Sequence, residues 1–390
     1  MSIKRGLARL AQTTPRKLDV ASVRGALPGG LRETEHGALH LIDEYLEPRH
    51  HHGRTPIASA LQVSTERLAQ LALNPELESI DLRRALFFDT ETTGLAGGTG
   101  TVPFLIGIAW FEDESMRIQQ LFLPEMGKEA PMLHWLRERV QQSSCVVSFN
   151  GKAFDWPLLR TRFVLNRVPA PSLPPHLDLL HCARRVLRPR LQSVRLVELE
   201  RKVLGMYRED DVSGALIPQL YFDYLDGGDI SPMAKVIEHN ANDLIALAAL
   251  VAELVGHFDE VHGSDDPRDH LAYAKVAERT GDPARARSFA VAAANGGGEA
   301  RCTVEACLLN ARMARRGGEI DDEERALLGA LEAADTDELR AGVRVALAKF
   351  YEHRRKDLAR ALEHATGTAL AEGEAAAERR VNRLRRRLSS

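Results

Sequence analysis

The chain has 390 residues, a net charge of −3 and an apolar fraction of 44%. Its length predicts two or more domains. Its charge excludes a global positive field that would attract nucleic acid to the whole surface. The four cysteines form no CxxC pair, which excludes zinc-binding spacing and favours free thiols in a reducing compartment. No apolar signal segment opens the chain and no apolar run approaches transmembrane length, so we expect a cytoplasmic protein without a membrane partner.

The first 80 residues are interpreted as an N-terminal extension that is partly disordered. Within it, residues 38–46 suit a strand, and Ser64 suits the N-cap of a helix over 64–73. Three adjacent histidines at 50–52 cannot all face one metal from a regular element, so we expect a surface loop there. A domain over 81–258, a polar linker over 259–268 and a helical domain over 269–390 complete the prediction.

The most informative stretch is the end of a short apolar strand over 85–89. Asp89 closes this strand, Glu91 follows two positions later, and Gly94 turns the chain. Residues i and i+2 of a strand point to the same face, so the two acids project together. Adjacent acids repel unless a cation lies between them, and Mg²⁺ takes oxygen ligands of this kind. The alternative is an acidic strand end that is simply solvated.

The following segments predict more strands and helices. Residues 102–111 and 115–123 suit a hairpin, and the preceding glycine-rich turn over 96–101 lacks the ending of a phosphate-binding P-loop. A helix is predicted over 128–142. A strand over 145–149 then brings Asp155 to a helix start, where its alternative role is to stabilise the helix dipole.

A basic segment and a long helix come next. Arg184, Arg185 and Arg188 form either a solvated face or a track for phosphates, and residues 191–204 suit a helix. A helix over 231–257 carries His239 and Asp243, which share one face because they lie four residues apart. An ordinary surface pair is the alternative.

Beyond residue 268 the chain becomes rich in alanine, arginine, glutamate and leucine. Ala274, Ala311 and Ala348 mark a period of 37 residues, and Gly281 and Gly318 keep the same phase. Such a period is typical of stacked helix pairs.

Three of these motifs together resemble the DEDD, or DnaQ-like, 3′–5′ exonuclease superfamily, which has a ribonuclease-H-like fold. They are Asp89-Thr-Glu91-Thr-Thr-Gly94, Asn150-x-x-x-Phe154-Asp155 and His239-x-x-x-Asp243. The histidine here occupies the spacing of the tyrosine subtype, four residues before the aspartate. The chain is also similar to the YprB-like bacterial branch, which carries tetratricopeptide-like repeats C-terminally.

The resemblance implies an α/β domain, with a ribonuclease-H-like mixed sheet flanked by helices, followed by an all-α helical-repeat domain. It also implies a two-metal phosphodiesterase that uses Mg²⁺ or Mn²⁺. The implied site comprises the metal ligands Asp89, Glu91, Asp155 and Asp243, the general base His239, and the substrate-binding residues Thr92, Thr93, Gly94, Leu95, Asn150 and Phe154.

The leading function is therefore a 3′–5′ exonuclease acting on single-stranded DNA or RNA. A structure-specific endonuclease or RNase would use the same residues. A non-catalytic scaffold is a third alternative, in which the fold grips nucleic acid and the repeats recruit a protein partner. The presence of all four acids argues against this scaffold.

Overall fold

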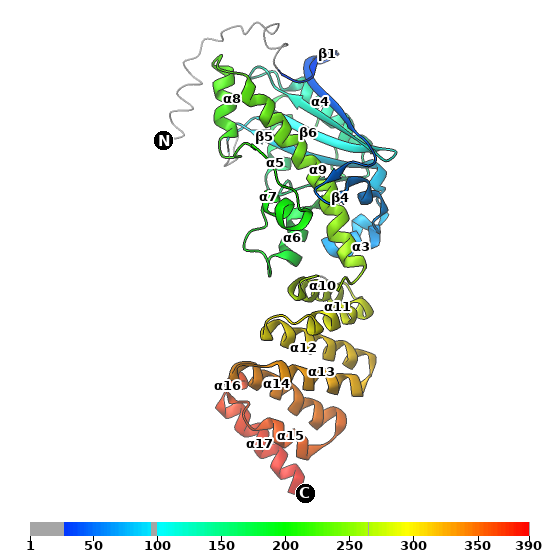
Figure 1. Cartoon of the computed structure of the whole chain (residues 1–390), viewed down its shortest axis with the longest axis vertical. Helices are drawn as coiled ribbons and strands as arrows, with labels where there is room; N and C mark the ends of the chain where they lie inside the picture. Colours follow the sequence, from blue (N-terminus) through cyan, green and yellow to red (C-terminus); the bar gives the residue numbers. More distant parts are fainter. Residues whose placement is uncertain (1–26, 95–99, 264, 390) are drawn as a thin grey trace. The chain divides into compact units, whose positions relative to one another are not determined.

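The computed structural model describes residues 27–94, 100–263 and 265–389 (Figure 1). Contacts divide the chain into two compact units. The first, which we call the sheet unit, comprises residues 1–62, 79–179 and 200–252, and the second, the helical unit, comprises residues 63–78, 180–199 and 253–390. Each unit is described below within the described part of the chain.

The sheet unit is built on a seven-stranded mixed sheet in the order β1-β2-β7-β6-β5-β8-β9. Its strands are β1 (Gly30–Thr34), β2 (Gly37–Leu46), β5 (Ala85–Thr92), β6 (Pro103–Glu112), β7 (Ser115–Phe122), β8 (Cys145–Ser148) and β9 (His176–Asp178). β5, β8 and β9 are parallel, whereas the other neighbours are antiparallel. The predicted mixed sheet is confirmed, and it begins earlier than residue 81 because β2 pairs with β7.

Four helices flank this sheet: α4 (Ala130–Gln142), α5 (Asp155–Leu165), α8 (Ile217–Leu225) and α9 (Ser231–Asp259). By length and composition alone α9 could cross a membrane, which corrects the expectation that no apolar run is long enough. Nevertheless, 72% of its most apolar window is buried in the structure, as in the core helix of a soluble protein.

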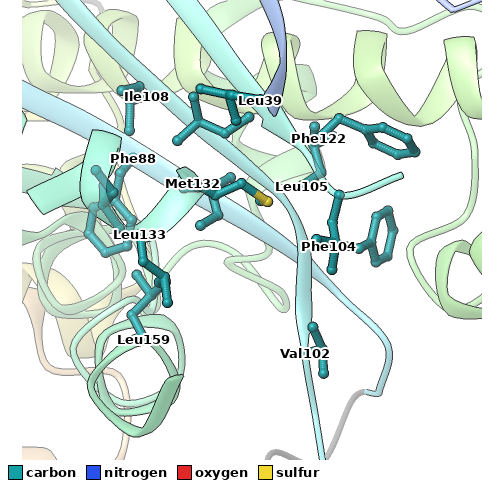
Figure 2. Packing of buried hydrophobic residues seen from close by; sticks show 14 of the residues in the cluster. Leu39, Phe88, Val102, Phe104, Leu105, Ile108, Phe122, Met132, Leu133 and Leu159 are labelled. Atoms are coloured by element: carbon teal, nitrogen blue, oxygen red, sulfur yellow. The ribbon is translucent and has the colours of Figure 1, made fainter. Parts of the chain in front are cut away.

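The core of the sheet unit lies between the sheet and its helices. Phe88 of β5 packs with Leu133 of α4 and Leu159 of α5 in one buried cluster (Figure 2). On α8, Tyr221 stacks on Phe104 with ring centroids 4.0 Å apart. Alternation along β5 therefore leaves Phe88 on the core face and turns Asp89 to the opposite face.

Two predictions for the sheet unit and its neighbouring segment are wrong. The helix expected over 191–204 is reduced to α7 (Leu196–Leu199), followed by a wider π-helical turn over Glu200–Leu204. The histidines at 50–52 do not form a plain surface loop. Instead His52 lies in the short hairpin of β3 (His51–His52) and β4 (Thr55–Pro56), where it is buried.

The described part of the C-terminal region contains only helices, as predicted. Its helices are α10 (Pro267–Arg279), α11 (Pro283–Asn295), α12 (Ala300–Gly317), α13 (Ile320–Ala333), α14 (Asp337–Phe350), α15 (Leu358–Ala365), α16 (Ala369–Glu372) and α17 (Glu374–Ser389), with a π-helical turn over Tyr351–Arg355. The helical unit also includes α3 (Thr65–Ala72), which Ser64 caps as predicted, and most of α6 (Leu179–Leu187). Short 3-10 turns occupy Ile57–Gln62, Pro75–Ser79 and Leu82–Arg84.

The 37-residue period corresponds to helix pairs. Ala274, Ala311 and Ala348 are buried at equivalent places in α10, α12 and α14. Gly281 and Gly318 both adopt positive φ in the turns that follow. In the third pair the positive φ moves to Lys356 instead, one residue after the expected position. The π-helical turn explains this shift, because it inserts one extra residue before the helix ends.

Candidate functional site

Asp89 and Glu91 project from the carboxyl-terminal half of β5, which is an interior strand. Asp89 pairs with Gly107 of β6, and Glu91 pairs with Leu105. Paired residues of antiparallel strands place their side chains on one face. That face is covered by α9, and only 13% of the Glu91 side chain is exposed. Asp89 and Glu91 therefore project from the same face of β5, as predicted.

Asn240 of α9 positions Asp89, and the sequence analysis missed it. Its side-chain amide donates a 2.8 Å hydrogen bond to Asp89 Oδ2. Gln120 of β7 in turn donates from Nε2 to Asn240 Oδ1 at 2.9 Å. Gly107 makes room for this bridge, because a Cβ there would lie 2.1 Å from Asn240 Oδ1. A glycine in a buried strand was the available signal, since it often marks a close approach of another element.

Asp155 reaches the same edge of the sheet from β8. Because β8 runs parallel to β5, the carboxyl ends of both strands meet there. Asp155 begins α5, so the positive end of the helix dipole faces its carboxylate, which also accepts a hydrogen bond from the Thr90 hydroxyl. Burial raises the pKa of Asp155 to about 6, although the Thr90 hydrogen bond opposes this shift.

His239 and Asp243 approach Glu91 from α9. His239 Nε2 lies 3.9 Å from Glu91 Oε1 and 3.7 Å from Asp243 Oδ2. One ligand atom from each of these three residues lies within 4.8 Å of the others, which is compact enough to hold a metal ion. Carboxylate oxygens such as those of Glu91 and Asp243 suit Mg²⁺ or Mn²⁺ better than soft metals, because they are hard donors.

Arg208 is a second residue that the sequence analysis did not assign to the site. Its side chain is only 4% exposed and forms ion pairs with Asp243 and Glu200, the latter at 2.8 Å. Glu200 Oε1 also lies 2.6 Å from His52 Nε2. Arg208 therefore supplies buried positive charge to the acids and connects them to the β3–β4 hairpin. Its signal in the sequence is the run of charged residues over 208–211, which usually indicates a solvated loop.

Asp211 determines which nitrogen of His239 carries a proton. His239 Nδ1 lies 2.7 Å from Asp211 Oδ1. A carboxylate can only accept, so Nδ1–H donates to Asp211. The 3.3 Å approach of Arg208 Nη1 to the same nitrogen is then not a hydrogen bond, because both groups are donors. In the neutral ring Nε2 is left as an acceptor, facing Glu91 and Asp243.

The site as a whole has an excess of negative charge. Burial raises the pKa of Asp89 well above its usual value, and the Asp243 and Asp155 carboxylates raise it further. Burial likewise raises the pKa of Glu91, and the neighbouring Asp89 carboxylate raises it further. Burial also raises the pKa of Asp243, but Arg208 opposes that shift. A divalent cation would relieve this repulsion, so the residues present fit a metal site.

The loop before α5 is held in a fixed conformation beside the acids. Asn150 has a positive φ of 69°. The backbone N–H groups of Asn150 and Lys152 donate to the Asp178 carboxylate at 2.8 and 3.1 Å. Phe154, the residue before Asp155, is half-buried. Asn150 and Phe154 thus lie on a loop that Asp178 holds next to Asp155, and their contact with substrate stays a prediction.

The other predicted substrate-binding residues are already engaged or cannot be placed. Thr92 donates its hydroxyl to the Gly94 carbonyl at 2.8 Å, and Thr93 exchanges hydrogen bonds with the backbone of Val102. These contacts close the turn after β5, and the substrate-binding role of Thr92, Thr93 and Gly94 stays a prediction. Leu95 lies outside the described residues. The structure thus brings together Asp89, Glu91, Asp155, His239 and Asp243, while Thr92 and Thr93 brace the turn.

Comparisons with known proteins agree with this geometry. Residues 86–255 match the model of the RNase_H superfamily. The chain is also 31% identical over 315 residues to the uncharacterized protein YprB of Bacillus subtilis, an alignment that covers 78% of this chain and 75% of that protein. The fold expected from the sequence resemblance is thereby confirmed, and the superfamily indicates a nuclease. Residues 86–255 thus form an RNase H superfamily domain, and the chain belongs to the same family as YprB.

Proposed function

We propose that this protein is a cytoplasmic, divalent-metal-dependent 3′–5′ exonuclease of single-stranded nucleic acid. The observation that carries the proposal is the convergence of Glu91, His239 and Asp243, with ligand atoms within 4.8 Å of one another, beside Asp89 and Asp155. Three separate segments of the sheet unit contribute these side chains. A stable fold does not require such a concentration of buried acids.

Asp89, Glu91, Asp155 and Asp243 would hold two Mg²⁺ or Mn²⁺ ions. When bound, such ions stabilise the negative charge that develops on phosphate oxygens during hydrolysis and lower the pKa of water. The residues around the acids hold their side chains in place and balance part of their charge. Asn240 fixes the rotamer of Asp89, and Thr90 fixes that of Asp155. Arg208 keeps part of the charge of Asp243 balanced.

His239 would act as the general base. Its Nδ1–H donates to Asp211, so its Nε2 can accept the proton of the attacking water. This arrangement of base and orienting carboxylate is typical of catalytic histidines. A phosphodiester placed against the acids, with its terminal nucleotide on the loop of Asn150 and Phe154, would present its phosphorus to that water. The half-buried ring of Phe154 offers a face for the terminal base.

The test uses the full chain with single-stranded DNA and single-stranded RNA of one sequence, each labelled at its 5′ end, in Mn²⁺. An exonuclease acting from the 3′ end gives a ladder of labelled products that shortens with time. A second substrate labelled at its 3′ end should release labelled mononucleotide first. Discrete internal fragments from both substrates would replace the proposal with an endonuclease. No cleavage of any substrate in Mn²⁺ or Mg²⁺ would contradict it.

A further inference from the structure

The helical unit contains a cavity of about 450 Å³ that the proposed chemistry does not use. Its wall is formed by α10, by the first turns of α12 and by the end of α6 with the residue Pro189. All its lining residues belong to the helical unit. The volume lies within the range of about 300–1,000 Å³ that is usual for ligand sites.

Positive charge predominates around this cavity. Its cationic side chains are Arg185, Arg268, Lys275, Arg279 and Arg301, and its acidic ones are Glu299 and Glu305. These give a local net charge of +3, whereas the whole chain carries −3. The sign of the charge around the cavity is therefore opposite to that of the protein as a whole, and an anionic ligand is the chemistry that it fits.

Several of these cations are not neutralised by neighbouring acids. Lys275 pairs with Glu305 at 2.7 Å, and Arg268 pairs with Asp266 at 2.8 Å. By contrast, Arg185 donates only to the carbonyl of Leu71 among the described residues. Over the same described part of the chain, Arg279 and Arg301 have no side-chain hydrogen bond or ion pair, and both are exposed. Two guanidinium groups thus face solvent, ready to bind an anion.

The inner wall of the cavity is apolar. It is formed by Leu271, Ala272 and Val276 of α10 and by Cys302 of α12, all of them buried. Such a wall suits the flat, weakly polar face of a base or sugar but offers few hydrogen-bond donors or acceptors that could read a base edge. Cations above an apolar wall match a polymer that alternates phosphates with bases.

We propose that this cavity binds the phosphate backbone of single-stranded nucleic acid, without preference for sequence. The proposal deepens the proposed nuclease function and rests on it for its substrate class. Guanidinium groups favour this ligand because their planar fork matches two phosphate oxygens. The helical unit then contributes to substrate affinity, while hydrolysis is performed by the acids of the sheet unit.

The test measures binding of a fluorescent oligothymidylate to the full chain by anisotropy, in EDTA so that no cleavage occurs. The double variant Arg279→Glu/Arg301→Glu should bind roughly tenfold or more weakly. The slope of its log affinity against log salt should also fall by about 0.7 for each lost phosphate contact. An oligonucleotide of mixed sequence should show the same loss.

A matched control carries the same charge change outside the cavity. Arg315→Glu/Arg379→Glu replaces two exposed arginines of the helical unit, one of them on the same helix as Arg301. This control should bind like the wild type, and both double variants should melt like the wild type. Equal weakening by the two double variants would contradict the proposal, because it would reveal only a general effect of charge.

Two further measurements distinguish this proposal from the nuclease proposal and from the binding of a protein partner. Cleavage of a dinucleotide in Mn²⁺ reports the acidic site alone and should be unchanged by the cavity substitutions. If the chain cleaves nothing but the cavity variant selectively loses oligonucleotide binding, the nuclease proposal fails and the cavity proposal stands. If a labelled oligoglutamate binds and depends on Arg279 and Arg301 while the oligonucleotide does not, the ligand is an acidic protein and the proposal is overturned.

Discussion

Buried acids at one place in the helical unit and at the end of β5 in the sheet unit are balanced in different ways. In the helical unit the Glu352 side chain is 1% exposed, and Arg383 and Arg387 pair with it at 2.6 and 2.8 Å. In the sheet unit, Asp89 and Glu91 lie among other carboxylates, and burial raises the pKa of both. An acid that is paired with arginine is compatible with a stable fold. Acids crowded together lower the free energy of unfolding unless a cation binds between them. This difference supports the proposal that the crowded acids at the end of β5 serve chemistry rather than stability.

The largest effect is expected from neutralising one crowded acid. Asp89→Asn or Asp155→Asn should abolish hydrolysis of single-stranded substrate in Mn²⁺, because each removes a proposed metal ligand while keeping the side-chain shape. Without metal, either variant should melt at or above the wild-type temperature, since repulsion is relieved. Turnover and thermal melting are measured in parallel. Full turnover by either variant would reject the metal assignment.

The second effect concerns the proposed base. His239→Ala should reduce turnover by about 10²–10⁴-fold, the usual contribution of general-base catalysis, while metal binding persists. His239→Tyr should recover part of the loss, because the tyrosine subtype has that residue at the same spacing. The orientation is tested by Asp211→Asn, which should lower kcat more than it raises KM. Wild-type turnover by His239→Ala would show that the histidine only packs.

A third prediction compares Gly107, where a side chain would meet Asn240, with Gly342, where it would meet no other atom. Gly107→Ala should destabilise the protein by about 1–3 kcal/mol, because the new methyl group overlaps Asn240. Gly342→Ala in α14 meets no atom within 4 Å and should stabilise the chain by about 0.5–1 kcal/mol. Chemical denaturation gives both values. An unchanged free energy of unfolding for Gly107→Ala would show that α9 does not need this close approach.

The smallest effect is a pH dependence in the helical unit. Hydrogen bonds that the protonated ring donates to Glu253 and to Asp265 raise the pKa of His257 from 6.5 to about 9. The folded state therefore binds this proton more tightly than the unfolded state. The resulting stabilisation is complete below about pH 6.5 and is lost as the pH rises through 9. The difference in melting temperature between the wild type and His257→Gln should shrink over that window.

His353→Gln provides the control for this comparison, because the His353 side chain is 61% exposed. Its melting difference from the wild type should vary little between pH 6.5 and 9. A constant difference for His257→Gln over the same window would contradict the assignment of that proton to the folded state.

Much of the acidic site was predictable because its signals are local. The apolar run before Asp89, the strand before Asp155 and the four-residue spacing of His239 and Asp243 each fix where a side chain points. The helical pairs were predictable for the same reason, since a repeated period indicates stacked units.

The remaining features depend on contacts between distant residues. β2 joins the sheet by pairing with β7, a partner that no local pattern specifies. Arg208 meets Glu200 and Asp243 only after the chain has folded, and the π-helical turn at Glu200 has no strong sequence signal. A charged run in a sequence is usually solvated, so the burial of Arg208 could not be predicted from its neighbours.

Calorimetric titration of the metal-free full chain with Mn²⁺ tests the central claim most directly. We predict saturable binding of two ions per wild-type chain. Asp89→Asn and Asp155→Asn should each lose at least one of these ions, whereas Gly342→Ala should bind as the wild type does. The absence of saturable binding, or unchanged binding by both acid variants, would contradict a metal site at the end of β5.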